Sequence, residues 1–226
     1  MTSNWDTVHR ERRMLAEDLA LLSEQQWATA SLCEGWDIHD VVAHLTGSAK
    51  TTRRSFWISL IRSGFSFDRA NAREVATERA TSPVETLARF RATITSTNTP
   101  PGPFITRLIE IVVHGEDIRQ PLGITRPGLP KLEDALHYVA GDRLDGGRKR
   151  LAGLEISATD EGFTIGSGES VRGPALSLLL AASGRPEGLR ELQGAGVVLL
   201  TERLNAVSRT RRSPHGPAPR SADGCP

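Results

Sequence analysis

The sequence predicts a mainly α protein with a small α+β part near its C-terminal end. Through most of residues 1–150, apolar residues recur at the 3.6-residue period of amphipathic helices. After Leu151 the pattern changes to the two-residue alternation of β-strands. Proline and glycine clusters separate the helical segments. We therefore expect a four-helix bundle over residues 1–150 and a small αβ domain over 151–205.

The first two helices have clear determinants. Large apolar side chains form one stripe along residues 5–22, which predicts the first helix. Asp37 is a good N-cap for the second, and Asp40 adds a negative charge to its first turn, where the helix dipole favours it. This helix is expected from Ile38 to Arg62, either continuous or broken near Gly47.

Three further helices are expected before the change of pattern. A polar, arginine-rich stretch over residues 68–81 follows the second helix. Ser82 and Pro83 then open a helix that continues to about Ile94. Beyond a proline cluster, residues 104–119 form a strongly apolar helix, and residues 130–150 predict another.

The C-terminal part alternates between strand and helix patterns. Strands are expected at 154–159, 163–166 and 168–173, followed by helices at 174–182 and 196–204. Residues 206–226 carry arginines and several prolines but few side chains that can pack. We expect them to form a disordered basic tail.

Composition limits the function classes. Lys and Arg number 28 against 27 Asp and Glu, a net charge of +1, which argues against a surface built for nucleic acid. No apolar run approaches the roughly 18 residues of a membrane helix, and the first residues do not resemble a signal peptide. We expect a cytoplasmic protein with no nucleic-acid or membrane partner. With only 2 cysteines, a disulfide framework and a structural thiolate zinc site are both excluded.

Three residues in apolar helices are candidate metal ligands. Glu110 and His114 are separated by one helical turn and share a face among apolar neighbours. His44 occupies a second apolar helix. If the two helices are neighbours, His44, Glu110 and His114 converge as two imidazoles and a carboxylate, the ligand set of a catalytic zinc site. Alternatively, His44 is a hydrogen-bonded core histidine and Glu110 and His114 form a buried pair.

Other residues near these positions are weaker candidates. Asp117, three residues after His114, is placed to orient a metal ligand or a thiol-bearing cosubstrate. Arg119 and Arg185 are candidates for binding anionic groups near the ion, Arg119 as a cofactor-binding residue like Asp117 and Arg185 as a catalytic residue. For Cys33 a structural thiol is favoured over a nucleophile, and His39 is expected at the surface.

Two stretches of the sequence carry a family resemblance. They are residues 31–45, SLCEGWDIHDVVAHL, and residues 110–123, EIVVHGEDIRQPLG. In these stretches the chain resembles the mycothiol-dependent maleylpyruvate isomerase family of actinobacteria, within the DinB-like superfamily of metal-binding four-helix bundles. The resemblance covers about residues 3–205.

The resemblance implies a metal-dependent enzyme that uses a small thiol. It assigns a divalent metal, usually zinc, to His44, Glu110 and His114, and it makes mycothiol the cosubstrate. The thiolate would add to an activated double bond of a small, carboxylate-bearing substrate, as a cis–trans isomerase or an S-transferase, with Arg185 at a position associated with substrate binding. A monomer or homodimer is expected. The alternatives are a metal-dependent hydrolase using metal-bound hydroxide and a non-catalytic DinB-fold binding protein.

Overall fold

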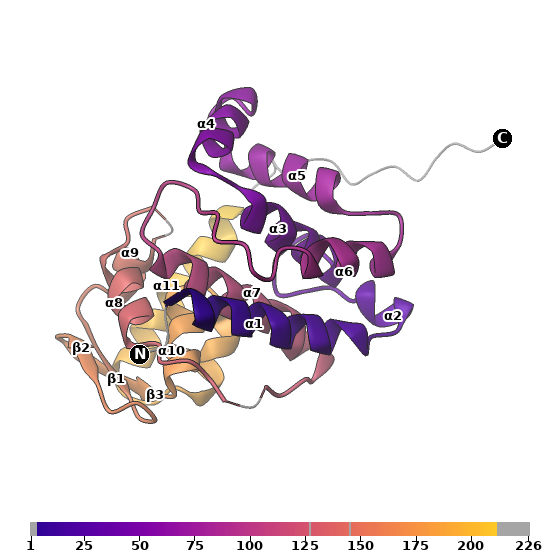
Figure 1. Ribbon diagram of the computed structural model, residues 1–226. Helices are drawn as coiled ribbons and strands as arrows, with labels where there is room; N and C mark the ends of the chain where they lie inside the picture. Colours follow the sequence, from indigo (N-terminus) through magenta and orange to yellow (C-terminus); the bar gives the residue numbers. More distant parts are fainter. Residues whose placement is uncertain (1–3, 127, 145, 212–226) are drawn as a thin grey trace. The chain divides into compact units, whose positions relative to one another are not determined.

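The computed structural model describes residues 4–126, 128–144 and 146–211 and divides into two compact units, Met1–Ala135 and Leu136–Pro226 (Figure 1). The predicted mainly α architecture with a small sheet is confirmed. This division, after residue 135, lies earlier in the chain than the domain limit expected at residue 150. The short helix Gly147–Leu151 packs on the sheet and therefore belongs to the second unit. Among the described helices, none combines the length and apolar character needed to cross a membrane.

The first unit is a helical bundle. Its helices are α1 (Asn4–Ala20), α2 (Glu24–Trp27), α3 (Ile38–Lys50), α4 (Arg53–Arg62), α5 (Phe67–Glu78), α6 (Pro83–Arg91) and α7 (Ile105–Leu122). Helix α3 contacts α5, α6 and α7, and α1 contacts α6 and α7 (Figure 1). The α3 side chains are buried along most of its length, so α3 is the central helix of this unit.

Helix α3 begins where the sequence predicts but ends earlier. The Asp37 side chain accepts a hydrogen bond from the Asp40 backbone N–H, and the Asp40 side chain accepts one from the Asp37 N–H. Arg79 donates to both carboxylates and ties the end of α5 to the start of α3. The expected helix to Arg62 is interrupted after Lys50, because Thr52 caps the new helix α4 through the Ser55 N–H. Of the two alternatives, the broken helix is observed, but the break lies at Thr51 and Thr52 and not at Gly47, which remains helical.

Helix α5 replaces the polar stretch expected at residues 68–81. Ser66 caps it by accepting a hydrogen bond from the Arg69 N–H, and Asp68 lies in its first turn. Val75 is its one buried residue. A helix with so little buried apolar surface shows no apolar stripe in its sequence, yet it supplies a side chain to the site described below.

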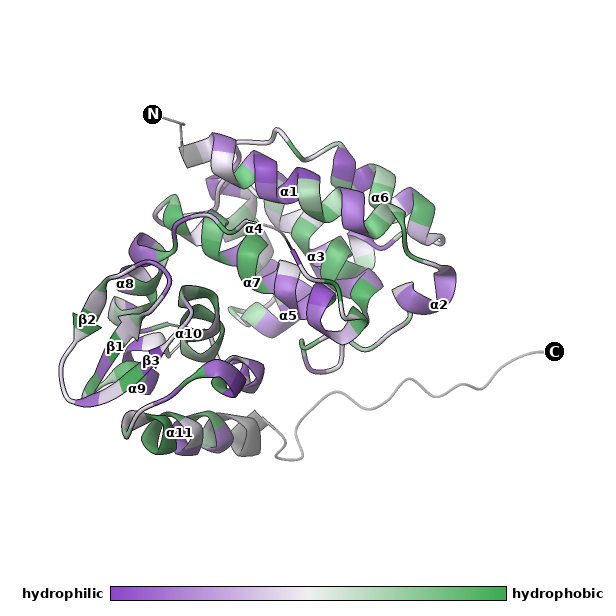
Figure 2. Ribbon diagram, turned by 90° about the horizontal axis from the view of Figure 1, so that it is seen from below, coloured by the Kyte–Doolittle hydropathy of each residue, from purple (hydrophilic) through white to green (hydrophobic). Residues whose placement is uncertain are grey.

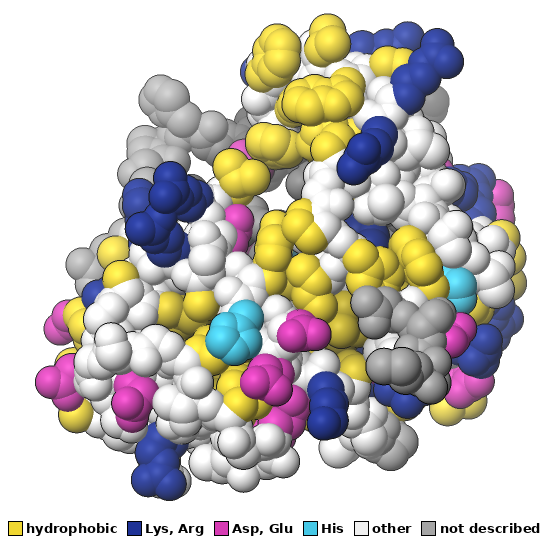
Figure 3. Space-filling model, turned by 60° about the vertical axis from the view of Figure 1, so that its left-hand side comes forward, with side chains coloured by type: hydrophobic (Ala, Val, Ile, Leu, Met, Phe, Trp, Pro, Cys, Tyr) yellow, Lys and Arg dark blue, Asp and Glu magenta, His cyan; other side chains and the backbone are white. Residues whose placement is uncertain are grey.

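Apolar side chains are exposed around α4. They are Trp57, Ile58, Ile61, Phe65 and Phe67. Figure 3 shows hydrophobic side chains gathered at the end of the molecule where α4 lies, next to Lys and Arg side chains. Within α4 only Leu60 is buried, so this helix contributes little to the core of its unit.

The second unit surrounds a three-stranded sheet of order β2-β1-β3. Its elements are the larger part of α8 (Glu133–Gly141), α9 (Gly147–Leu151), β1 (Leu154–Ala158), β2 (Thr164–Gly166), β3 (Glu169–Gly173), α10 (Ala175–Ala182), η1 (Pro186–Glu191) and α11 (Gly196–Arg211). Strand β1 pairs antiparallel with β2 and parallel with β3, so that Ile156 lies opposite Ile165 and Val171. Helix α10, apolar on nearly every side (Figure 2), packs on β1 and β3.

Two expectations for this unit are corrected. The single helix at 130–150 is instead two helices, α8 and α9, separated by a bend in which Arg148 N–H bonds back to the Asp142 carbonyl. Helix α11 continues to Arg211, so residues 206–211 are helical rather than part of a disordered tail. The remainder of the predicted tail, residues 212–226, lies outside the described residues.

Candidate metal centre

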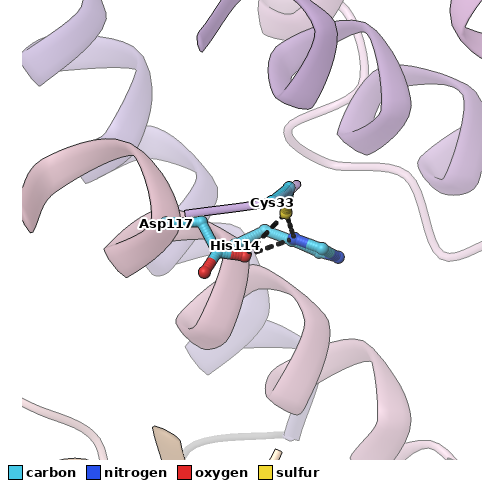
Figure 4. A group of neighbouring side chains, drawn as sticks. All are labelled: Cys33, His114 and Asp117. Carbon is cyan, nitrogen blue, oxygen red and sulfur yellow. Dashed lines mark hydrogen bonds and ion pairs between the residues drawn. The ribbon is translucent and has the colours of Figure 1, made fainter. Parts of the chain in front are cut away.

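A cluster of three potential ligands joins the loop before α3 to helix α7 (Figure 4). The Cys33 thiol donates to Asp117 Oδ2 at 3.0 Å and lies 3.5 Å from His114 Nδ1. His114 Nδ1 is itself 2.9 Å from the same Asp117 oxygen. These ligand atoms all lie within 4.8 Å of one another. A thiol, an imidazole and a carboxylate at such spacing are donors that zinc accepts.

Backbone hydrogen bonds hold the Cys33 loop against α7. The Leu32 N–H donates to the Asp117 carbonyl at 3.1 Å, and the Cys33 N–H donates to Ser31 Oγ at 3.1 Å. Asp117 is completely buried, whereas the His114 side chain is 18% exposed. In Figure 4 the His114 ring extends away from Cys33 and Asp117, so its second nitrogen, Nε2, is on the side opposite to them.

His114 meets His44 from α3. The centroids of the two rings are 5.1 Å apart, with the rings nearly perpendicular. Trp36 packs against His44 on another side, at a centroid distance of 5.2 Å. The structure thus brings together the two histidines that the sequence singles out, at a distance that one bridging ion can span.

His44 also faces a carboxylate on α5. Its Nδ1 lies 3.2 Å from Glu74 Oε1. Both atoms are buried, and neither has a hydrogen bond of regular geometry among the described residues. Burial is the largest single influence on the ring and disfavours its charge, but Glu74 and Glu110 together outweigh it and raise the pKa of His44.

Glu110 is held by its own helix and by α3. Ser48 donates to Oε1, and Arg107 donates to Oε2 at 3.0 Å. Burial alone would raise the pKa of Glu110, but the charge of Arg107, with smaller effects of His44, Ser48 and His114, lowers it. Glu110 therefore stays ionised, and both oxygens have protein partners.

The predicted ligand set is partly assembled. His44 and His114 are neighbours, and Glu110 influences the charge of both. Among the described residues, however, the trio of ligand atoms within 4.8 Å of one another is that of Cys33, His114 and Asp117, because Ser48 and Arg107 engage Glu110. Ligation by His44, Glu110 and His114 stays a prediction. The buried, unpartnered His44 Nδ1 and Glu74 Oε1 indicate a polar site that a bound cation would stabilise.

The other candidates have different surroundings. Asp117 lies in the cluster and contacts His114, and its predicted role in orienting a ligand or binding the cofactor stays a prediction. Arg119 is 1% exposed, with Nε 2.7 Å from Asp18 Oδ2 and Nη1 3.7 Å from Glu116. These ion pairs indicate a structural role, and the role of Arg119 in cofactor binding stays a prediction. Arg185 belongs to the second unit, where it donates to the Ser183 carbonyl, and its role in substrate binding stays a prediction.

His39 is a core residue and not the surface residue expected. It is 5% exposed, its Nε2 lies 2.6 Å from Thr86 Oγ1, and its ring packs edge-on against Trp27. The polar neighbours Asp37 and Asp40 favoured an exposed position for His39 in the sequence, but its ring points toward Thr86 of α6.

Sequence reasoning missed Glu74, Arg107 and Ser48. Arg107 was detectable in principle, because it precedes Glu110 by three residues and so lies on the same helix face. Gly47 was a second signal. A Cβ atom at this position would lie 2.2 Å from Glu74 Cγ, so the absence of a side chain admits Glu74 to the site.

A cavity of about 510 Å³ borders the site between the C-terminal part of α3 and helices α4 and α5. Gly47 and Glu74 form part of its wall. Three cationic side chains, Lys50, Arg62 and Arg73, also line it, together with the Glu78 carboxylate, which pairs with Lys50 at 2.6 Å. Such a lining suits a ligand that carries a carboxylate.

The chain is similar to one protein family and to two solved structures. Residues 8–101 match the family described as mycothiol maleylpyruvate isomerase N-terminal domain. A crystal structure of the mycothiol-dependent maleylpyruvate isomerase has a TM-score of 0.55 at 16% identity, covering 85% of this chain and 91% of that one. The crystal structure of a histidine-to-alanine mutant of the mycothiol-dependent maleylpyruvate isomerase has a TM-score of 0.56 at 15% identity, with the same coverage of both chains. At such identities the likeness shows the fold alone. No curated protein matches the sequence.

The family match and the site overlap in part. Cys33, His44 and Glu74 lie inside the matched residues 8–101. Helix α7, which carries Glu110, His114 and Asp117, follows the matched range. The structural likeness extends over 85% of the chain, well beyond that range.

Proposed function

We propose that the chain is a metal-dependent enzyme that uses mycothiol as its cosubstrate, because residues 8–101 match the mycothiol maleylpyruvate isomerase N-terminal domain. This match confirms the family resemblance of the sequence. The reaction is a cis–trans isomerisation or a thiol transfer on a small electrophile that carries a carboxylate. The meeting of the His44 and His114 rings at 5.1 Å, from two different helices, is the observation that carries the proposal.

The chain's own residues would bind and orient the ion. His44 and His114 supply imidazole nitrogens, with Glu110 as the carboxylate of the set. Asp117 holds His114 through its Nδ1, which leaves the opposite ring nitrogen, Nε2, for coordination. When bound, a divalent ion lowers the pKa of a coordinated thiol and so provides a thiolate near neutral pH.

The substrate class follows from the cavity beside Glu74. Lys50, Arg62 and Arg73 would attract a carboxylate-bearing molecule and orient its double bond for attack by mycothiol. Sulfur adds to one carbon of the double bond and a proton to the other. Rotation followed by loss of both restores the double bond in the other configuration. If the adduct is released instead, the product is a thioether.

A second arrangement of ligands is favoured by one observation, the compact Cys33–His114–Asp117 cluster. Both arrangements contain His114, but only the first requires His44 and only the second requires Cys33. Zinc content of purified His114→Ala, His44→Ala and Cys33→Ala therefore separates them. We expect His114→Ala and His44→Ala to lose zinc and Cys33→Ala to retain it.

Thiol dependence tests the chemistry. Purified protein is incubated with a panel of unsaturated diacids, with and without mycothiol, and products are identified by mass spectrometry. We expect turnover only with mycothiol. Turnover without any thiol would support the hydrolase alternative, and a zinc-free, inactive protein would support a binding protein.

A further inference from the structure

We propose that Glu74 is a positioning residue that accepts a hydrogen bond from the Nδ1–H of His44 and thereby presents Nε2 of this ring to the metal ion. The inference rests on the proposed function for the identity of the ion. Nothing in the sequence pattern assigns a role to Glu74. It lies on α5, which is otherwise a polar helix on the outside of the bundle.

The first support is the contact itself. His44 Nδ1 and Glu74 Oε1 form an ion-pair contact at 3.2 Å, and no hydrogen bond of regular geometry engages either atom among the described residues. A buried ring nitrogen and a buried carboxylate oxygen are costly without hydrogen bonds, so we infer that a small rotation of either side chain aligns the Nδ1–H with this oxygen. The side chains are only 12% and 24% exposed, respectively, which limits competition from water.

The second support is the space made for the carboxylate. Gly47, one turn after His44 on α3, has no side chain, and a Cβ atom there would lie 2.2 to 2.9 Å from Glu74 atoms. Thr51 Oγ1 lies 3.3 Å from the second oxygen, Oε2, and 3.0 Å from the Gly47 carbonyl, so its one proton is shared between these two acceptors. Helix α3 thus provides both an opening and a hydrogen bond that orient Glu74 toward His44.

The third support is the parallel with the other histidine. His114 Nδ1 lies 2.9 Å from Asp117 Oδ2, so each of the two facing imidazoles has a carboxylate at Nδ1. The two carboxylates come from different helices, α7 and α5. Histidines that bind metals commonly donate their remaining ring N–H to a carboxylate, which selects the tautomer and the ring orientation. Equivalent partners on both rings indicate that both coordinate through Nε2.

The test compares Glu74→Ala with Glu78→Ala in the full chain. Glu78 lies one turn further along α5 and pairs with Lys50 at 2.6 Å, away from the histidines, so it is a matched control. Zinc affinity is measured by competition with a chromogenic chelator. We expect Glu74→Ala to bind one zinc about 10- to 100-fold more weakly than the unmodified protein. Glu78→Ala should retain the full affinity.

A second readout does not need the metal. In zinc-free protein at a pH where the ring is neutral, ¹⁵N chemical shifts report which nitrogen of His44 carries the proton. We expect it on Nδ1 in the unmodified protein and in Glu78→Ala, and we expect Glu74→Ala to lose this preference. Circular dichroism of all variants verifies that they fold.

The outcomes separate this inference from the proposed function. If His44→Ala loses zinc but Glu74→Ala binds it with full affinity and keeps the Nδ1 proton, the inference is wrong and the proposed function stands. If the unmodified protein binds no zinc, the proposed function fails. In that case the position of the His44 ring proton still decides whether Glu74 orients His44. A proton on Nε2 would show that it does not, and the inference would then be wrong too.

Discussion

Asp117 Oδ2 lies 2.9 Å from Nδ1 of His114, one turn earlier on the same helix, and the Cys33 thiol donates to the same oxygen at 3.0 Å. One fully buried carboxylate oxygen therefore fixes both the ring and the loop before α3. The free energy cost of burying its charge is offset by these two hydrogen bonds. This relationship makes Asp117 the residue on which the orientation of His114 depends.

Replacing Asp117 by Asn should weaken metal binding without abolishing it. The amide has nearly the same shape but carries no charge, so it holds the N–H of His114 less strongly. We expect zinc affinity to fall about 10- to 100-fold and the free energy of unfolding to fall by about 1–3 kcal/mol. Chelator competition and urea unfolding measure the two effects. Asp134→Asn, at an exposed position of α8, is the control for zinc affinity and should leave it unchanged. Full affinity in Asp117→Asn would show that His114 is oriented by other contacts.

Gly47→Ala should destabilise the protein and disturb the site together. The new Cβ atom would lie 2.2 Å from Glu74 Cγ, so the Glu74 side chain must move away from His44. We expect a loss of about 1–3 kcal/mol in the free energy of unfolding, as is typical for overpacking, together with weaker zinc binding.

The control for this variant is Gly141→Ala. Gly141 is also helical, and a Cβ atom there meets nothing within 4 Å. Because alanine favours helix, this change should be neutral or stabilising by up to about 1 kcal/mol. Equal unfolding free energies for the two variants would contradict the close packing of Glu74 against Gly47.

Elements with local determinants could be predicted from the sequence. The cap formed by Asp37 and Asp40 predicted the start of α3, and the alternating residues after Leu151 predicted all three strands. Helix α5 was missed because only Val75 of its residues is buried. Its position depends on tertiary contacts, such as the bonds of Arg79 to the start of α3, which leave no periodic pattern in α5 itself.

For the candidate site too, some residues could be predicted from the sequence and others could not. His44, Glu110 and His114 stood out because polar side chains in apolar helices are costly unless they have partners. Their partners could not be identified in advance. Cys33 and His114 are separated by 81 positions in the sequence, and Glu74 lies on the helix that the sequence did not reveal. Such pairings follow from the packing of helices, which a single sequence does not specify.

Arg119→Met tests whether this residue is structural. Its guanidinium pairs with Asp18 of α1 and lies 3.7 Å from Glu116, and it is almost completely buried. Removing it leaves acidic groups without their partner, so we expect a loss of at least about 2 kcal/mol in the free energy of unfolding. Zinc affinity should be unchanged. A variant of normal stability that no longer responds to mycothiol would instead restore the role in cofactor binding expected from the sequence.

The last prediction concerns acid stability and His39. Burial, followed by the charge of Arg79, lowers the pKa of His39 below its ordinary value of 6.5. As the pH falls through 6.5, the unfolded chain takes up a proton at this position before the folded protein does. The free energy of unfolding therefore decreases until the pH is below the folded-state pKa. The Thr86 hydroxyl accepts a hydrogen bond from the Ala80 N–H and lies 2.6 Å from Nε2 of His39. It can therefore donate its own proton to Nε2, which accepts a hydrogen bond only when the ring is neutral.

His39→Gln isolates this effect. Glutamine keeps a polar group near Thr86 but does not titrate, so the loss of stability between pH 8 and pH 5 should be smaller in the variant than in the unmodified protein. His44, whose pKa is raised, acts in the opposite direction, because its contribution is present at low pH and is lost as the pH rises. Since His44 is the same in both proteins, its effect cancels in the comparison. Urea unfolding of the zinc-free proteins across this range provides the measurement, and parallel pH profiles would show that His39 is protonated equally in the folded and unfolded states.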